Sequence, residues 1–101
     1  MARLEIVVPR NFNDGTPVSS AAFDALDQFF AEEFGGYSRR EISGGWKDPQ
    51  TGQIMKDQSF EYIVNSPLIN KRIINELATT IKSYWEQNAV YFTLDGQSKI
   101  V

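Results

Sequence analysis

The 101-residue chain contains no cysteine and no histidine. Disulfide bonds, thiolate nucleophiles and cysteine-based zinc sites are therefore excluded, and so are imidazole acid–base catalysis and Ser-His-Asp triads. A bound metal would have to be held by carboxylate and carbonyl oxygens, which suit magnesium or calcium. No spacing of such residues specifies a site, and we expect neither a metal nor a cofactor.

The chain also lacks long apolar runs and an excess of positive charge. No stretch approaches the roughly 20 apolar residues of a membrane-spanning helix, and the charged start at residues 1–5 does not fit a secretory signal. The formal net charge of -3 disfavours a nucleic-acid-binding protein, which usually carries a basic field. We therefore expect a cytoplasmic protein that binds neither nucleic acid nor membrane.

The hydrophobic content of 42% fits one globular domain over residues 1–101. A domain of this size buries a limited fraction of its surface, so self-association would help to stabilise it.

Two segments carry apolar residues at helical spacing. The first follows an N-cap at Ser19 or Ser20 and stops at Gly35–Gly36. We assign its apolar face to a helix–sheet core rather than to a ligand site; the face consists of Ala22, Phe23, Leu26, Phe29, Phe30 and Phe34. The second is predicted to begin at Ser66–Pro67. Its apolar face consists of Ile69, Ile73, Ile74, Leu77, Ile81 and Trp85.

Four segments are predicted to be strands, at residues 4–8, 37–42, 54–64 and 89–94, because apolar residues alternate there or run between turn residues. Residues 98–101 are either a tail or a short extra strand.

The segment between the second and third strands has the composition of a hairpin. In Asp48–Gly52, Pro49 presets the first turn position and Gly52 accepts positive φ. The preceding Gly44–Gly45 pair predicts a bulge or a close backbone approach.

The predicted order β-α-β-β-α-β indicates an α+β, ferredoxin-like fold, with a four-stranded antiparallel sheet and two helices on one face. The other face remains uncovered. Strand alternation places on it Glu5, Val7, Glu61, Ile63, Tyr91 and Thr93. This mixture favours a dimer or trimer that buries the face; the alternative is a solvated face with scattered apolar residues.

Six residues are candidates for ligand binding: Arg39, Arg40, Trp46, Lys47, Glu61 and Tyr91. The basic residues put positive charge around the hairpin, which suits a small anionic ligand; the alternative is a pair of solvated edge strands. Trp46 is either a binding platform or a residue that packs the hairpin base. Glu5, Glu41 and Glu61 either converge as acid–base groups or as a magnesium site, or are solvated face residues, which we favour. No catalytic residue is identified.

Four motifs together resemble a known group of proteins: Phe34–Tyr37, Gly45–Gly52, Asp57–Tyr62 and Gln87–Phe92. They resemble small bacterial ferredoxin-like domains of unknown function, which share Phe-Gly-Gly, Gly-Trp-x-Asp-Pro-x-Thr-Gly and Gln-x-x-Val motifs. More loosely, the layout is similar to PII-like and CutA-like signalling proteins. The resemblance implies a ferredoxin-like fold and brings no activity.

Two hypotheses for the function follow. The first is a regulatory domain, not an enzyme, that self-associates and binds a small ligand or a protein through the hairpin and the uncovered face. The second is a small isomerase- or lyase-like enzyme with a carboxylate/arginine site between subunits.

Overall fold

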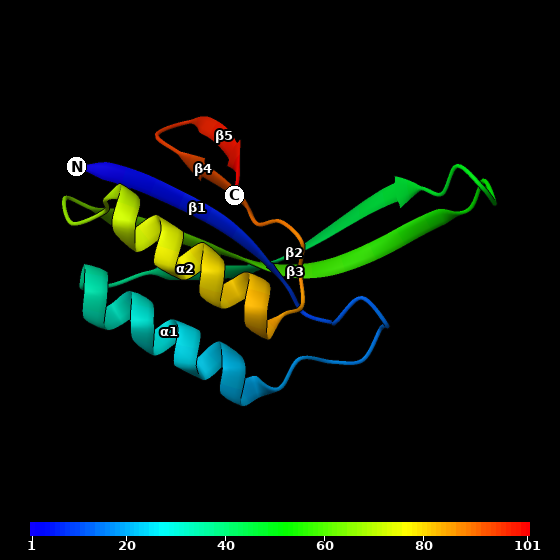
Figure 1. Cartoon of the computed structure of the whole chain (residues 1–101), viewed down its shortest axis with the longest axis horizontal. Helices are drawn as coiled ribbons and strands as arrows, with labels where there is room; N and C mark the ends of the chain where they lie inside the picture. The colour runs from blue at the N-terminus through cyan, green and yellow to red at the C-terminus, as the bar shows by residue number, and fades with distance from the viewer.

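The computed structural model describes all of residues 1–101 and shows an α+β fold (Figure 1). Its elements in chain order are β1 (Ala2–Pro9), α1 (Ser20–Phe34), β2 (Ser38–Lys47), β3 (Ile54–Ser66), α2 (Lys71–Tyr84), β4 (Tyr91–Leu94) and β5 (Gln97–Ile100).

The sheet is antiparallel and has five strands in the order β2-β3-β1-β4-β5. The prediction of four strands is therefore wrong, and the fold is not strictly ferredoxin-like. Asp95 and Gly96 take φ values of 50° and 83°, and such positive values at both positions of a two-residue loop make a tight hairpin turn. The chain therefore folds back after β4 and adds β5 at that edge.

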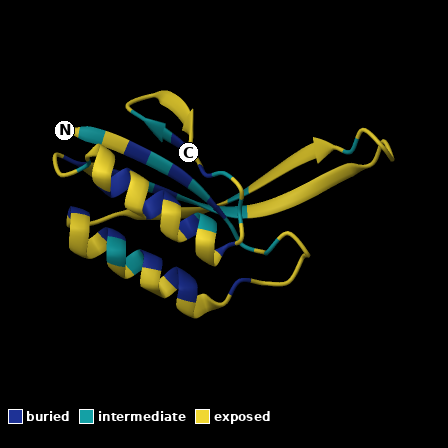
Figure 2. Cartoon of the chain, in the orientation of Figure 1, coloured by how far each residue is buried: buried dark blue, intermediate teal, exposed yellow.

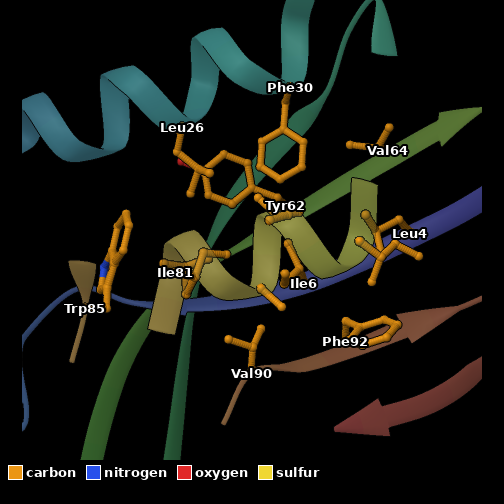
Figure 3. Close-up of a cluster of buried hydrophobic side chains, with 14 of the residues drawn as sticks. Leu4, Ile6, Leu26, Phe30, Tyr62, Val64, Ile81, Trp85, Val90 and Phe92 are labelled. Carbon is orange, nitrogen blue, oxygen red and sulfur yellow. The ribbon is translucent and has the colours of Figure 1, made fainter. Parts of the chain in front are cut away.

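Both helices lie side by side over one face of the sheet, as predicted (Figure 1). A cluster of 19 buried residues fills the space between the layers. Figure 3 shows how side chains from α1 and α2 meet those of the sheet, among them Phe30, Tyr62 and Ile81. The indole Nε1 of Trp85 donates a hydrogen bond of 3.0 Å to the carbonyl oxygen of Pro9, so the end of α2 is tied to the end of β1.

The ends of α1 match the prediction. The Ser19 side chain accepts a hydrogen bond from the Ala22 amide, and Gly35 ends the helix at φ 83°. The predicted start of α2 is wrong, because Asn70 is its N-cap and accepts from the Ile73 amide at 3.0 Å. Ser66 instead ends β3, where it is buried and pairs with Ala2 of β1.

The distal halves of β2 and β3, residues 43–58, extend beyond the body of the molecule as a two-stranded finger (Figure 1). Its residues are exposed apart from Asp48 at the tip (Figure 2), and the molecule measures 45 × 30 × 22 Å. Gly52 in the tip takes φ 73°, as predicted. No bulge occurs at Gly44 and Gly45, which pair in register with Asp57 and Lys56.

Neither helix has the length and apolar character needed to cross a membrane.

Candidate functional site

The predicted composition of the uncovered face is confirmed by the strand register. Glu5 lies opposite both Ile63 and Thr93, and Val7 lies opposite Glu61. Residues directly opposite each other in an antiparallel pair point to the same side of the sheet. Tyr91 joins this side and lies opposite Ile100 of β5.

The uncovered face is hollowed by a groove of about 520 Å³, which we call the open-face groove. Four strands contribute to it. The lining residues are Glu5, Val7, Glu61, Tyr91, Phe92, Thr93, Ser98, Lys99 and Ile100. Two carboxylates therefore share one groove with an aromatic ring, and β5, which sequence reasoning left undecided, supplies one wall.

Glu61 is the more enclosed of the two carboxylates, with a side chain only 15% exposed. Arg40 of the neighbouring strand holds one of its oxygens, since the arginine Nε and Nη2 lie 2.8 and 2.7 Å from Oε1. The other oxygen, Oε2, has no hydrogen bond within the chain. Every buried polar side-chain atom of the molecule has a hydrogen-bond partner, so an atom without a partner is not buried. Oε2 is therefore accessible and available to a ligand in the groove.

Glu5 is held in a similar way, because Arg3 Nε lies 2.9 Å from its Oε1. The two residues stand two positions apart on β1, so they share a face. Sequence reasoning missed Arg3, although this i, i+2 spacing in a predicted strand was the signal. The groove thus has two oriented carboxylates, each paired with the guanidinium of an arginine that does not itself line the groove.

Tyr91 is 62% exposed and Ile100 beside it is 65% exposed. Two large apolar side chains exposed side by side are costly to hydrate and favour contact with a ligand or a partner. The aromatic ring also attracts cations to its face.

Arg39 lies on the opposite side of the sheet from Arg40, under the edge of α1. Its Nη1 lies 2.9 Å from Asp27 Oδ2, and its guanidinium carbon lies 4.5 Å from the centre of the Phe60 ring. The buried Tyr62 hydroxyl donates to Asp27 Oδ1 at 2.7 Å. Burial raises the pKa of Tyr62, and the hydrogen bond to Asp27 raises it further. This cluster joins α1 to the sheet and is separate from the open-face groove.

Trp46 and Lys47 lie on the finger, away from the open-face groove. Glu41 does not converge with the other two carboxylates, because it pairs with Arg10 at 3.3 Å on the helix side of the sheet. Of the six candidates, the structure brings together Arg40, Glu61 and Tyr91; the part of each in ligand binding stays a prediction. No cluster of three or more acidic side chains is close enough to hold a metal ion.

No protein-family model matches the chain, and no curated protein matches it in sequence. Two solved structures match its fold, and both are of a phage S-adenosylmethionine (SAM) lyase. The one in complex with S-methyl-5′-thioadenosine has a TM-score of 0.71 and 12% identity, over 99% of this chain and 88% of that chain. The apo structure has a TM-score of 0.63 and 14% identity, over 99% and 86%.

These comparisons correct the resemblance drawn from the motifs. The group of bacterial domains of unknown function and the PII-like and CutA-like proteins are the wrong relatives, because the matching structures are those of a lyase. The hypothesis of a regulatory domain that is not an enzyme is overturned by the same finding, which favours the lyase-like alternative. The short motifs misled because glycine and proline at turns specify local backbone geometry and recur in unrelated proteins. Over nearly its whole length, this chain has the fold of the phage SAM lyase.

Proposed function

We propose that the protein is a lyase that cleaves SAM and releases S-methyl-5′-thioadenosine. The observation that carries the proposal is the fold match to the phage SAM lyase over 99% of this chain. Because a fold hosts many functions, the chemistry of the open-face groove has to support it separately.

The groove suits a cationic substrate. SAM carries a positive sulfonium, a positive ammonium and a negative carboxylate group, and the groove offers the carboxylates of Glu5 and Glu61 together with the single cation of Lys99. Glu61 is mostly enclosed, and an opposite charge is attracted more strongly where water is partly excluded. The exposed face of Tyr91 adds a second element that attracts cations. The product thioether is neutral, so these contacts favour substrate over product.

The reaction itself needs no imidazole or thiol, which this chain lacks. Formation of S-methyl-5′-thioadenosine breaks the bond between sulfur and the four-carbon amino acid chain, and the electron pair stays on sulfur. If no water takes part, the carbon that loses its bond to sulfur regains a full valence in one of two ways. Either the substrate's own carboxylate oxygen bonds to it and closes a five-membered lactone, or a base removes a proton from the neighbouring carbon and an alkene forms.

The enzyme's contribution would be positioning and electrostatics. A carboxylate whose second oxygen is free, as in Glu61, can hold the ammonium or sulfonium group and fix the chain in a reactive conformation. Arg40 fixes the Glu61 carboxylate by binding its first oxygen. In the elimination route, the same free oxygen is the acceptor for the proton.

The test is incubation of purified protein with SAM, followed by mass spectrometry of both products. We expect S-methyl-5′-thioadenosine and a four-carbon product that takes up no label from ¹⁸O-water in short incubations. The mass of the second product distinguishes lactone from alkene. Homoserine labelled from the start of the reaction would show a hydrolase instead, and no release of S-methyl-5′-thioadenosine would refute the proposal.

The Glu61→Gln variant tests the site. We expect kcat/KM to fall about 10- to 100-fold, because the substitution keeps the shape of the side chain and removes its charge. Glu33→Gln is the matched control, since Glu33 is exposed on α1, and its activity should equal that of the wild type. Equal activity of both variants would place catalysis elsewhere on the molecule.

We further infer that the protein self-associates through the uncovered face and that it works in the cytoplasm. The exposed Tyr91 and Ile100 support the first inference.

A further inference from the structure

A second hollow, of about 620 Å³, lies where the finger leaves the body of the molecule. We call it the finger-base hollow. The finger forms one wall with Trp46 and Met55, the loop between β1 and α1 forms another with Asn11 and Phe12, and Gln87 follows from the end of α2. The proposed function makes no use of this hollow.

The finger-base hollow continues the open-face groove along the same strands. Pro9 and Ser59, a cross-strand pair, line the hollow. The next cross-strand pair on the same side of the sheet is Val7 and Glu61, two residues before Pro9 on β1 and two residues after Ser59 on β3. This pair lines the groove. Residues two apart on a strand point to the same side and lie about 7 Å apart. One elongated molecule can therefore occupy both spaces.

The apolar wall of the hollow is a flat surface for stacking. Trp46 is 50% exposed and Met55, its cross-strand partner, is 40% exposed. The other tryptophan, Trp85, is 2% exposed and belongs to the core. An indole left half in water on a projecting finger gains little from burial, and indoles are good platforms for planar heterocycles.

The polar wall of the hollow is rich in carboxamides with free hydrogen-bonding atoms. The Asn11 side chain has no hydrogen bond within the chain. The Gln87 side chain donates through its nitrogen to Asn13 and to the Trp85 carbonyl, so its oxygen is left for a ligand. The Gln58 side chain points to the helix side of the sheet, where it accepts from Arg10, and takes no part. Asn11 offers a donor beside an acceptor, the pattern that reads the edge of adenine, and Gln87 adds one acceptor.

The charges around the hollow nearly cancel, because Lys56 and Asp57 both line it. A neutral ring that offers both donors and acceptors fits this environment better than an anion does.

We propose that the finger-base hollow binds the adenine base of the substrate, with the ring stacked on Trp46 and its edge bonded to the carboxamides. The ribose and the sulfonium then extend along β1 and β3 to Glu61. This inference rests on the proposed function for the identity of the substrate and adds the subsite that selects its base.

The test is a titration of the purified protein with adenosine, which carries the base but no sulfonium, followed by tryptophan fluorescence and by calorimetry. We expect saturable quenching by adenosine and markedly weaker quenching by uridine at equal concentration, because both rings stack but only adenine presents the edge that the carboxamides read. Trp46→Leu should raise the Kd for adenosine about tenfold or more, since loss of one stacking platform has an effect of that size. Trp46→Phe should recover most of the affinity.

Ile54→Ala is the matched control. Ile54 is an exposed apolar residue of the same finger and does not line the hollow, so its substitution should leave the Kd unchanged. Circular dichroism of each variant checks that the fold is retained.

The outcomes distinguish this inference from the proposed function. If SAM is cleaved but neither the Kd for adenosine nor the KM for SAM depends on Trp46, the adenine subsite is refuted and the lyase stands. If adenosine binds with dependence on Trp46 but SAM is not cleaved, the base site stands and the lyase is refuted. Failure of adenosine to bind the wild-type protein refutes the subsite.

Discussion

Two mostly enclosed carboxylates in this molecule have different surroundings. Asp27 is 19% exposed and both of its oxygens are engaged, by Arg39 and by the Tyr62 hydroxyl. Glu61 is 15% exposed, but only its Oε1 is engaged. A carboxylate with every acceptor satisfied has little left to offer a ligand, whereas one with a free oxygen can bind or accept a proton. Asp27 is therefore structural, and Glu61 is the candidate for chemistry.

Removal of the Tyr62 hydroxyl tests the structural role of the Asp27 cluster. Tyr62→Phe keeps the ring but takes a 2.7 Å hydrogen bond from an enclosed carboxylate. We expect the free energy of unfolding to fall by about 1–3 kcal/mol, the usual cost of such a loss, as measured by urea denaturation at pH 7. Tyr91→Phe is the control, because Tyr91 is exposed and its hydroxyl has solvent around it; a similar loss in both variants would contradict the assignment.

The same residue, Tyr62, should also affect how stability falls at alkaline pH. Burial, together with the hydrogen bond to Asp27, raises the pKa of Tyr62 above its usual value of 10.0. The folded state therefore keeps this proton at pH values where the unfolded state loses it. The corresponding stability is fully present below pH 10.0 and is lost as pH rises above it. Between pH 9 and 11, we expect urea denaturation to show a larger fall in stability for the wild type than for Tyr62→Phe. Parallel falls would show that Tyr62 does not contribute.

At the scale of elements, the spacing of apolar residues correctly predicted the structure of segments that depend on neighbouring residues. It failed for segments whose structure depends on residues far away in the sequence. Both helices and four strands follow from apolar spacing, and the alternation of β1 and β3 gave the uncovered face correctly. Ser66–Pro67 has the composition of a helix start, but Ser66 is instead held in the sheet by its pairing with Ala2, which lies at the other end of the chain. The residues near Ser66 in the sequence give no indication that it pairs with Ala2.

The site was predictable only in part, for the same reason. Alternation places Glu61 and Tyr91 on one face, and it also separates Arg39 from Arg40, which are neighbours on a strand and must face opposite sides. The finger-base hollow depends on the direction in which the finger leaves the sheet and on Gln87, which arrives from α2. Neither the direction of the finger nor the position of Gln87 can be predicted from the spacing of nearby residues.

The corrected start of α2 leads to a prediction. Asn70→Ala removes the side-chain acceptor of the Ile73 amide and should lower the free energy of unfolding by about 1 kcal/mol. Asn75→Ala, at an exposed position inside α2, should change it by less than about half that amount. If the two variants have equal midpoints in chemical denaturation, Asn70 is not the cap.

The end of α1 offers a matched pair of glycines. Gly35 has φ 83°, whereas Gly36 is not at positive φ, and neither would place a Cβ near other atoms. Gly35→Ala should therefore destabilise the protein by about 1 kcal/mol through backbone strain alone. Gly36→Ala should be neutral or slightly stabilising, because it restricts the unfolded chain. Thermal unfolding of the two variants distinguishes them, and an unchanged melting temperature for Gly35→Ala would contradict the left-handed cap.

At the scale of the whole molecule, the core lies entirely on one side of the sheet, and the other side carries the groove. The exposed pair Tyr91 and Ile100 borders that groove. A second copy that covered these residues would bury apolar surface and enclose the ligand at the same time.

The proposed self-association is tested with Ile100→Asp, which puts a charge on the uncovered face. We expect the mass measured by light scattering to shift from a dimer or trimer toward 11.5 kDa, the mass of one chain. Leu68→Asp is the control, because Leu68 is similarly exposed, at 58%, in the turn between β3 and α2. A wild-type protein that already has the mass of one chain would refute self-association.

The finger has a practical consequence for experiments on this protein. Its tip, residues 48–53, is closed by its own short hydrogen bonds, such as the one from the Gly52 amide to the Asp48 carbonyl at 2.8 Å. Exposed hairpin ends of this kind tolerate inserted sequence better than packed loops do. An epitope or a reporter peptide placed there would be displayed far from the helices and would leave both chain termini free for other fusions.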